Sequence, residues 1–242
     1  ASSILLHGDL DNALSTIFAF PGGFGTASTY MPLPAIDPSV AVVGLNSPFL
    51  NAPSAFNVTL SELASLYVSE IRRQKAVGPY DLMGYSVGGV IAYEAAHQLI
   101  ASGERVSRLL LLDSACPALV PPFPLSLLDF FDNIDRFKGT SSYKKKMRDP
   151  HIVATLEALY QYTPLPMPDG CSPQTLLIAA RHGVDRGMNV TRPAVNELEQ
   201  IVLQWVLDDR SDFGPGGFGW DRLISGESIT VVPVDGNHFS LM

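Results

Sequence analysis

A serine set between glycines is the strongest chemical signal in the sequence. The segment Gly84-Tyr85-Ser86-Val87-Gly88 follows the apolar run from Tyr80 to Met83 and opens a helical pattern. A strand, a sharp turn and a helix in this order expose a serine hydroxyl above a sheet, and flanking glycines let strand and helix approach closely. The motif also occurs by chance in Ser/Gly-rich turns. In this context it predicts Ser86 as the nucleophile of an acyl-transfer enzyme.

A serine nucleophile needs a histidine base, and five histidines compete for that role. His238 lies in a loop just past the last predicted strand, whose carboxyl end meets the level of the turn at Ser86. Of the other four, His97 lies in a helix and His7 lies before the first turn. His151 follows a proline, and His182 follows a strand. Only His238 satisfies the order serine, acid, histidine at a strand end, so we predict it as the base.

Two aspartates could orient the base, and their spacing from the other motifs makes them nearly equal candidates. Asp113 ends the strand that follows the nucleophile strand, while Asp185 follows the next strand. Each could instead be a solvated turn carboxylate or a helix cap. Asp235 is too close to His238 in a tight turn to be the favoured partner.

The tetrahedral intermediate of acyl transfer needs two backbone N–H donors. One is the amide that follows the nucleophile, at Val87. The other is expected in the glycine-rich loop from Phe18 to Gly25, where we predict Gly23, with Gly22 and Phe24 as close alternatives. This loop lacks the spacing and the terminal Lys-Ser/Thr of a phosphate-binding P-loop, so nucleotide binding is a poor alternative.

These residues must be positioned by a sheet, and the pattern predicts an α/β fold. Apolar β-rich runs alternate with helix-period segments, which favours a mostly parallel sheet with helices on both faces. The clearest helices run from Leu60 to Gln74 and from Val87 to Ser102. The predicted strands are Ile4–His7, Thr16–Phe20, Val40–Leu45, Tyr80–Tyr85, Arg108–Asp113, Thr175–Ala180 and Ser228–Val234.

A long insertion separates two of the predicted strands. About sixty residues lie between Asp113 and Thr175, where a crossover needs far fewer. We predict a lid over residues 115–166, within a single domain that spans 1–242. Its aromatic residues are either lid core or a wall of a substrate chamber. The chamber is expected to include Phe130, Phe131 and Tyr160, together with Phe24 and Tyr85 beside the turn.

Composition narrows the classes of partner. The net charge of −8 leaves no basic surface for non-specific nucleic-acid binding. Two cysteines, Cys116 and Cys171, have neither metal-knuckle spacing nor the density of a disulfide scaffold, and no apolar run approaches the ~20 residues that span a bilayer. We therefore expect free thiols, no metal and no membrane span. The first residue is not Met, which suggests a domain of a longer polypeptide.

Several motifs together resemble a known family, the type I thioesterase domains of polyketide and nonribosomal peptide synthetases, which have an α/β-hydrolase fold. The resemblance runs along nearly the whole chain. Within this family, the sequence most resembles the thioesterase/Claisen cyclase domains of fungal non-reducing polyketide synthases. The motifs are Phe18-Ala19-Phe20-Pro21-Gly22-Gly23, the stretch from Val77 to Gly89, Leu111-Leu112-Asp113-Ser114 and Gly236-Asn237-His238-Phe239.

The resemblance implies more than the residues alone do. It favours Asp113 over Asp185 as the acid, because in that family the acid follows the strand after the nucleophile strand. It implies that this domain binds no cofactor of its own and that an acyl carrier protein presents the polyketide substrate on a phosphopantetheine arm. A cytoplasmic, multidomain synthase is the expected setting. The family continues past the histidine into a closing helix, whereas this chain stops at Met242.

Three functions remain open on the sequence. The first is a thioesterase/Claisen cyclase that takes an aromatic polyketide onto Ser86 and releases it by forming a carbon–carbon bond. The second is a hydrolytic thioesterase or esterase with the same residues. The third is a non-catalytic module that binds a carrier protein. The basic run Lys144–Arg148, near Lys138, is either a docking surface for an acidic carrier protein or a solvated lid segment.

Overall fold

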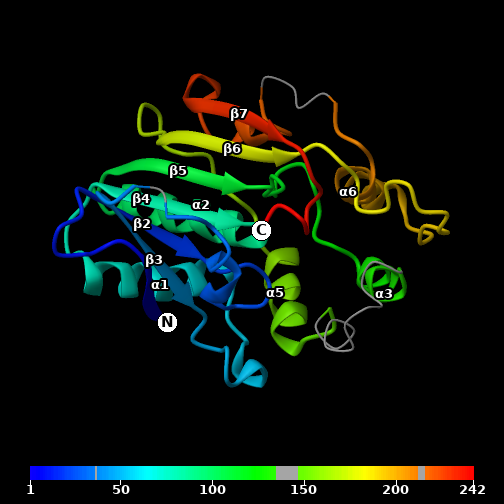
Figure 1. Ribbon diagram of the computed structural model, residues 1–242, viewed down its shortest axis with the longest axis horizontal. Helices are drawn as coiled ribbons and strands as arrows, with labels where there is room; N and C mark the ends of the chain where they lie inside the picture. Colours follow the sequence, from blue (N-terminus) through cyan, green and yellow to red (C-terminus); the bar gives the residue numbers. More distant parts are fainter. Residues whose placement is uncertain (36, 135–146, 212–215) are drawn as a thin grey trace.

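The protein is built on a seven-stranded sheet with the strand order β1-β3-β2-β4-β5-β6-β7. The computed structural model describes residues 1–35, 37–134, 147–211 and 216–242. Strand β1 pairs antiparallel with β3, and every other pair is parallel (Figure 1). The strands are β1 (Ser2–His7), β2 (Ser15–Phe20), β3 (Val40–Asn46), β4 (Tyr80–Tyr85), β5 (Val106–Leu112), β6 (Gln174–Ala180) and β7 (Ile229–Val234).

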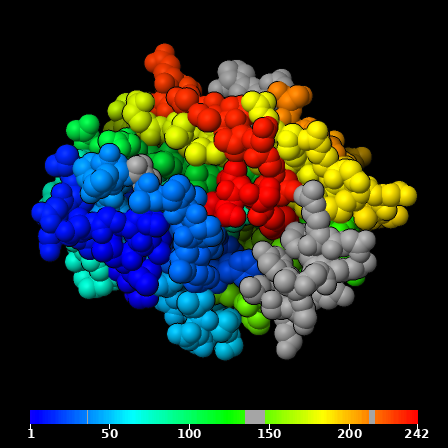
Figure 2. All heavy atoms as spheres, in the orientation of Figure 1, coloured from blue at the N-terminus to red at the C-terminus, as the bar shows by residue number. Residues whose placement is uncertain are grey.

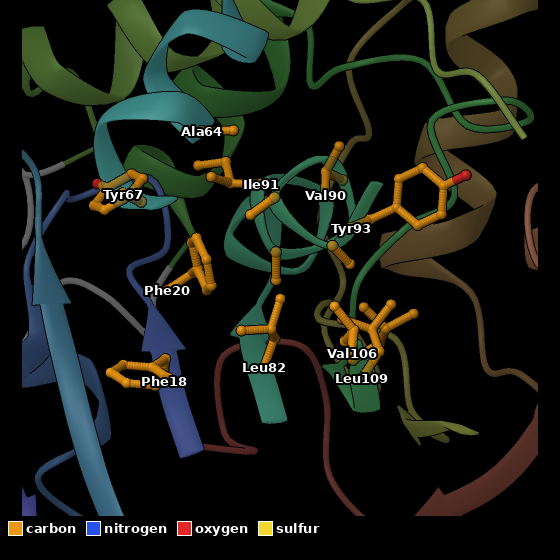
Figure 3. Packing of buried hydrophobic residues seen from close by; sticks show 14 of the residues in the cluster. Phe18, Phe20, Ala64, Tyr67, Leu82, Val90, Ile91, Tyr93, Val106 and Leu109 are labelled. Atoms are coloured by element: carbon orange, nitrogen blue, oxygen red, sulfur yellow. The ribbon is translucent and has the colours of Figure 1, made fainter. Parts of the chain in front are cut away.

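Alternating side chains along the central strands divide the core into two layers. Phe18 and Phe20 of β2 and Leu82 of β4 face helices α1 (Leu60–Gln74) and α2 (Val87–Ala101) (Figure 3). Ile17 and Met83 point to the opposite face. That second face is covered by the 3₁₀ helix η1 (Ala27–Tyr30) and by residues at the C-terminal end of the chain. Strand side chains have a period of two, so both faces of β2 and β4 are apolar and buried.

Helix α1 has a clear start and one apolar face. Thr59 caps it by accepting from the Glu62 amide, while the Glu62 carboxylate accepts from the Thr59 amide. Helix α2 is apolar on nearly every side because it packs between the sheet and α1. Its first residue follows Ser86 directly, so the strand-to-helix turn is held on both sides by buried elements.

Three further helices gather at the end of the sheet toward which the arrows of β5 and β6 point (Figure 1). Helices α3 (Leu125–Asn133) and α5 (Pro150–Tyr160) belong to the long segment between β5 and β6, and α6 (Glu197–Leu207) lies between β6 and β7. Shorter 3₁₀ helices are η2 (Pro53–Ala55), η4 (Trp220–Arg222) and η5 (Gly226–Ser228). The carboxyl ends of the parallel strands are thus surrounded by helices.

The predicted α/β fold is confirmed, and each of the seven predicted strands is present within two residues of its expected ends. The helix from Leu60 to Gln74 has the predicted bounds, whereas α6 was not singled out in the sequence. Cys116 is buried and Cys171 is exposed, both as free thiols. The predicted basic run lies largely outside the described residues, apart from Met147 and Arg148. No helix of the described ranges is long and apolar enough to cross a membrane.

The residues after β7 cross the middle of the face shown in Figure 2, between the N-terminal elements and the yellow region that holds α6. Asn237 shapes this segment, because its side-chain oxygen accepts from the amides of Phe239 and Ser240 at 3.0 and 3.1 Å. The Asx turn places His238 above the carboxyl ends of the central strands.

Candidate active site

Ser86 lies at a strained turn between β4 and α2. Its φ of 56° and ψ of −130° are unusual for a residue with a side chain. The two glycines of the motif allow this turn: a Cβ on Gly84 would lie 2.1 Å from the Gly88 carbonyl oxygen, and one on Gly88 would lie 2.6 Å from the Phe20 carbonyl oxygen. The Ser86 amide donates to the Leu112 carbonyl at 3.0 Å, which fixes the turn to β5.

Ser86, His238 and Asp113 form one hydrogen-bonded chain. The Ser86 hydroxyl lies 3.1 Å from His238 Nε2, and His238 Nδ1 lies 2.8 Å from Asp113 Oδ2. With Asp113 ionised, Nδ1 carries the imidazole proton, so Nε2 is left to accept from the serine. His238 and Asp113 are buried, at 2% and 1% exposure. The structure therefore brings together the three residues that we predicted as nucleophile, base and acid.

Asp113 is held as a carboxylate in spite of its burial. Burial raises its pKa, but the hydrogen bond and charge of His238, followed by those of Arg210, outweigh that effect and leave the pKa below its ordinary value. Oδ1 also accepts from the Ala180 amide at 2.8 Å. The residue has a φ of 43°, a conformation that aspartate tolerates better than most side chains.

Aromatic side chains surround the His238 ring. Tyr85 stacks on it with a centroid distance of 5.1 Å, and its hydroxyl donates to the His238 carbonyl at 2.6 Å. The Trp205 ring meets the imidazole edge-to-face at 5.2 Å, and Phe123 and Phe239 complete the enclosure. These contacts restrict the ring to one orientation.

The competing residues lie elsewhere. Asp185 pairs with Arg192 at 2.7 Å, and the Asp235 side chain is 90% exposed and faces Arg181 and His182. His151 of α5 has its Nδ1 2.8 Å from the Gly23 carbonyl oxygen. The remaining alternatives, His7 and His97, lie on β1 and within α2.

The glycine-rich loop after β2 lies beside the nucleophile. Gly23 and Val87, our predicted oxyanion donors, line the same cavity as Ser86, as do Gly22 and Phe24. Val87 is the first residue of α2, where the helix dipole favours negative charge. The buried hydroxyl of Tyr30 joins loop and turn: it donates to the Phe20 carbonyl at 2.5 Å and accepts from the Tyr85 amide at 2.8 Å.

Ser86 and His238 open into a cavity of about 580 Å³, a volume typical of small-molecule sites. Of the residues that we predicted for the chamber, Phe24, Tyr85 and Phe131 line the cavity, whereas Phe130 and Tyr160 do not. Phe130 is buried in the cluster behind the wall, and Tyr160 is 54% exposed. The cavity is mostly apolar on the side of the β5–β6 segment, where the wall includes Val120, Pro121, Phe123, Leu128, Ile152, Leu156 and Leu159.

A family model for the thioesterase domain matches residues 15–242. The chain belongs to the thioesterase domain family. Its fold is the α/β-hydrolase fold of that family, with a mostly parallel sheet.

This thioesterase domain is similar to regions of fungal polyketide synthases. It is 38% identical over 242 residues to the non-reducing polyketide synthase terA of Aspergillus terreus and 36% identical over 248 residues to the bikaverin polyketide synthase bik1 of Gibberella fujikuroi. The conidial pigment polyketide synthase alb1 of Aspergillus fumigatus is 39% identical over 253 residues. Each match covers 100% of this chain and 12% of the synthase, so the domain corresponds to a small part of each relative.

Solved thioesterases share the fold of this thioesterase domain. The NocB thioesterase domain of the nocardicin cluster, solved as a covalent complex with a fluorophosphonate nocardicin G analogue, has a TM-score of 0.65 and 26% identity, covering 99% of this chain and 91% of its own. The RedJ thioesterase of Streptomyces coelicolor has a TM-score of 0.66 at 20% identity, covering 97% and 86% of the two chains.

Sequence reasoning missed three residues of this thioesterase site. Arg210 contacts Asp113, Trp205 contacts His238, and Tyr30 joins the two loops. Arg210 follows two aspartates and has the pattern of a solvated turn, so nothing local marked it. Trp205 lies on the apolar face of α6, where a helical period could have indicated burial but not a histidine partner.

Proposed function

We propose that this domain is a thioesterase/Claisen cyclase that takes an aromatic polyketide from a carrier protein and releases it as a cyclised product. The observation that carries the proposal is the hydrogen-bonded chain from Ser86 through His238 to Asp113, which opens into a mostly apolar cavity. Membership in the thioesterase family and similarity to fungal non-reducing polyketide synthases support it. An acyl carrier protein would present the substrate on its phosphopantetheine arm, inside a larger intracellular synthase.

In the first stage Ser86 is acylated. His238 Nε2 takes the hydroxyl proton as the serine oxygen attacks the thioester carbon. The oxyanion that forms is stabilised by backbone N–H groups, for which Gly23 and Val87 are the candidates. His238 then returns the proton to the departing pantetheine thiolate, and the polyketide is left as an oxyester on Ser86.

In the second stage the acyl chain itself supplies the nucleophile. A carbon between two carbonyl groups is acidic enough for His238 Nε2 to take one of its protons. The enolate attacks the ester carbonyl, a carbon–carbon bond forms, and the Ser86 alkoxide leaves and recovers its proton from His238. Hydrolysis competes at this stage, because a water activated by His238 could attack the same ester. The apolar wall of the β5–β6 segment favours cyclisation, since it excludes water and holds the chain folded.

Product analysis by mass spectrometry tests the proposal. The substrate is an aromatic polyketide thioester surrogate with an acidic methylene, incubated with the wild type and with Ser86→Ala. A cyclised product that disappears in the variant supports Claisen chemistry through an acyl-serine. Free acid that depends on Ser86, with no cyclised product, would show the hydrolytic alternative instead.

A non-catalytic carrier-binding role is the alternative from another class. Its test is covalent labelling by a fluorophosphonate, a reagent class with which the NocB thioesterase domain forms a covalent complex. Labelling that is lost in Ser86→Ala and in His238→Ala supports an enzyme. An unlabelled wild type that still binds a carrier protein would favour the module.

Two finer proposals concern the synthase and its carrier. The motifs resemble most narrowly those of norsolorinic acid synthase of the aflatoxin pathway, so we propose that this domain belongs to a synthase of that kind; the identity of the released product tests it. We also propose that the basic run Lys144–Arg148 meets the acidic carrier. Charge reversal there should weaken turnover of carrier-bound substrate and spare a small thioester, and equal loss on both would remove the docking idea.

A further inference from the structure

A buried arginine contacts the carboxylate that orients His238. Arg210 Nη2 lies 2.9 Å from Asp113 Oδ1 and 3.0 Å from Oδ2, so one nitrogen bridges both oxygens. Only 5% of the Arg210 side chain and none of the Asp113 side chain is exposed. With His238 and the Ala180 amide, the carboxylate accepts from three different residues.

The surroundings fix the guanidinium in place. The Arg210 amide donates to the Arg181 carbonyl at 2.7 Å, which ties the segment after α6 to the end of β6. The guanidinium carbon lies 4.8 Å from the centre of the Trp205 ring and 5.9 Å from that of Phe218. Trp205 also contacts His238, so arginine, indole and imidazole form one packed group.

Stability alone is a weak reason for this arrangement. Burying an arginine and an aspartate costs desolvation energy that their attraction only roughly repays. In addition, Arg210 Nε is buried without a hydrogen-bond partner in the described part of the chain, which carries its own cost. A buried charge that carries such costs beside the carboxylate that orients His238 points to a role in the chemistry.

We propose that Arg210 is a positioning residue for Asp113: it offsets the negative charge of the carboxylate and fixes it with one oxygen toward His238, so that His238 presents Nε2 to Ser86. The inference rests on the proposed function, because it assigns a role within the same catalytic set. Arg210 touches neither the nucleophile nor the cavity, and it acts only through Asp113.

The charges around His238 determine the expected direction. The titratable or charged groups that face it are Asp113 just after β5, Tyr85 at the end of β4, Ser86 in the turn that follows, and Arg210 through Asp113. Its other neighbours are the aromatic rings of Trp205, Phe123 and Phe239. Without Arg210 the carboxylate charge is uncompensated and attracts a proton to the imidazole, so the unprotonated base is lost at a higher pH.

The test uses Arg210→Gln, which removes the cation but keeps an N–H donor, and Arg210→Lys, which keeps the cation without the planar fork. The control is Arg192→Met, which breaks the ion pair between Arg192 and Asp185 in the same region and leaves the three site residues untouched. Each protein is followed by the rate of fluorophosphonate labelling against pH, by kcat and KM for a small thioester, and by thermal unfolding.

We expect Arg210→Gln to lower kcat by about 10- to 100-fold with little change in KM, by analogy with the loss seen when the hydrogen-bonding partner of a metal-bound side chain is removed. The acid limb of its pH–rate profile should move to higher pH. Arg210→Lys should keep the acid limb and lose several-fold in kcat, and Arg192→Met should match the wild type in both.

Three results would overturn or separate the proposals. Wild-type kcat and acid limb in Arg210→Gln would overturn the role of Arg210. If Arg210→Gln does not fold, Arg210→Lys decides: a lower kcat at an unmoved acid limb supports positioning, and an unchanged kcat overturns it. A wild type that is not labelled at Ser86 would instead overturn the proposed function, whatever the Arg210 variants do.

Discussion

At the scale of single residues, the Tyr30 hydroxyl ties the glycine-rich loop to the nucleophile turn. Tyr30→Phe removes the partner of the Phe20 carbonyl and of the Tyr85 amide in a buried site. We expect about 1–3 kcal/mol lower unfolding free energy and a reduced kcat, because the two halves of the proposed oxyanion site would lose their alignment. Urea unfolding and thioester turnover measure the two effects.

Tyr80→Phe is the matched control for that variant. Tyr80 is equally buried, and its hydroxyl donates to the Lys75 carbonyl at the opposite end of β4. It should lose stability without a specific loss of kcat. If both variants lose kcat to the same extent, Tyr30 has no special alignment role.

Sequence reasoning reached the residues whose neighbours along the chain carry a pattern. Ser86 has its glycines, His238 follows a strand, and the structure brings both together with Asp113. Asp113 and Asp185 could not be separated by spacing, because the difference lies in their partners: Asp185 is paired with Arg192. Arg210 was out of reach for the same reason, since its contact with Asp113 joins positions that are 97 residues apart.

At the scale of elements, helix α5 is fixed to the glycine-rich loop through His151. Gly25 has a φ of 70°, and a Cβ on it would lie 2.4 Å from the His151 ring. Gly25→Ala should therefore combine backbone strain of about 1–2 kcal/mol with a displacement of His151 from the Gly23 carbonyl, lowering both stability and kcat.

Gly103→Ala isolates the strain. Gly103 has a φ of 87° at the end of α2 and open space around its missing Cβ. Gly103→Ala should lose about as much stability as the backbone strain costs Gly25→Ala, and it should keep the wild-type kcat. Equal kcat in Gly25→Ala and Gly103→Ala would show that the contact of His151 with the Gly23 carbonyl does not position the glycine-rich loop.

The contact between α1 and β1 should depend on acidity. The Arg73 hydrogen bond is the main cause that lowers the pKa of Glu70 from 4.5 to about 2, and Ser3 of β1 also donates to this carboxylate, at 2.5 Å. A lowered pKa means that the contribution is complete above about pH 4.5 and is lost as the pH falls toward 2. The protection factors of the β1 amides, which correct for the pH dependence of intrinsic hydrogen exchange, should fall over this interval in the wild type, and Glu70→Gln should abolish the change.

At the scale of the whole molecule, the proposed function makes the fate of the acyl chain depend on how the β5–β6 segment closes the cavity. Phe123 lines the cavity and contacts Trp205 and His238, so Phe123→Ala would open space beside the base. We expect the ratio of free acid to cyclised product to rise several-fold, because water gains access to the ester. Leu125→Ala is the control, since Leu125 belongs to the same segment, is 54% exposed and does not line the cavity. An unchanged ratio in Phe123→Ala would mean that this wall does not exclude water.

The order of strands and helices followed from apolar periodicity, whereas the shape of the cavity did not. Phe130 and Phe131 are adjacent in α3, yet only Phe131 reaches the cavity. Which of two neighbouring aromatic residues faces inward depends on how α3 is rotated against α6, and that contact is set by residues far apart in sequence. The sequence therefore indicates an aromatic wall but does not show which aromatic residues form it.

The contact between Trp205 and His238 also makes the protein its own optical reporter. The chain has two tryptophans, and the other, Trp220, is buried beside Tyr93 and donates to the Ser114 carbonyl. A protonated imidazole quenches the fluorescence of an adjacent indole, so Trp205 emission should fall as the pH is lowered, with Trp220 as a steady background. In Trp205→Phe this pH-dependent quenching should vanish. Such quenching would make the charge state of His238 readable in solution, without substrate and without a label.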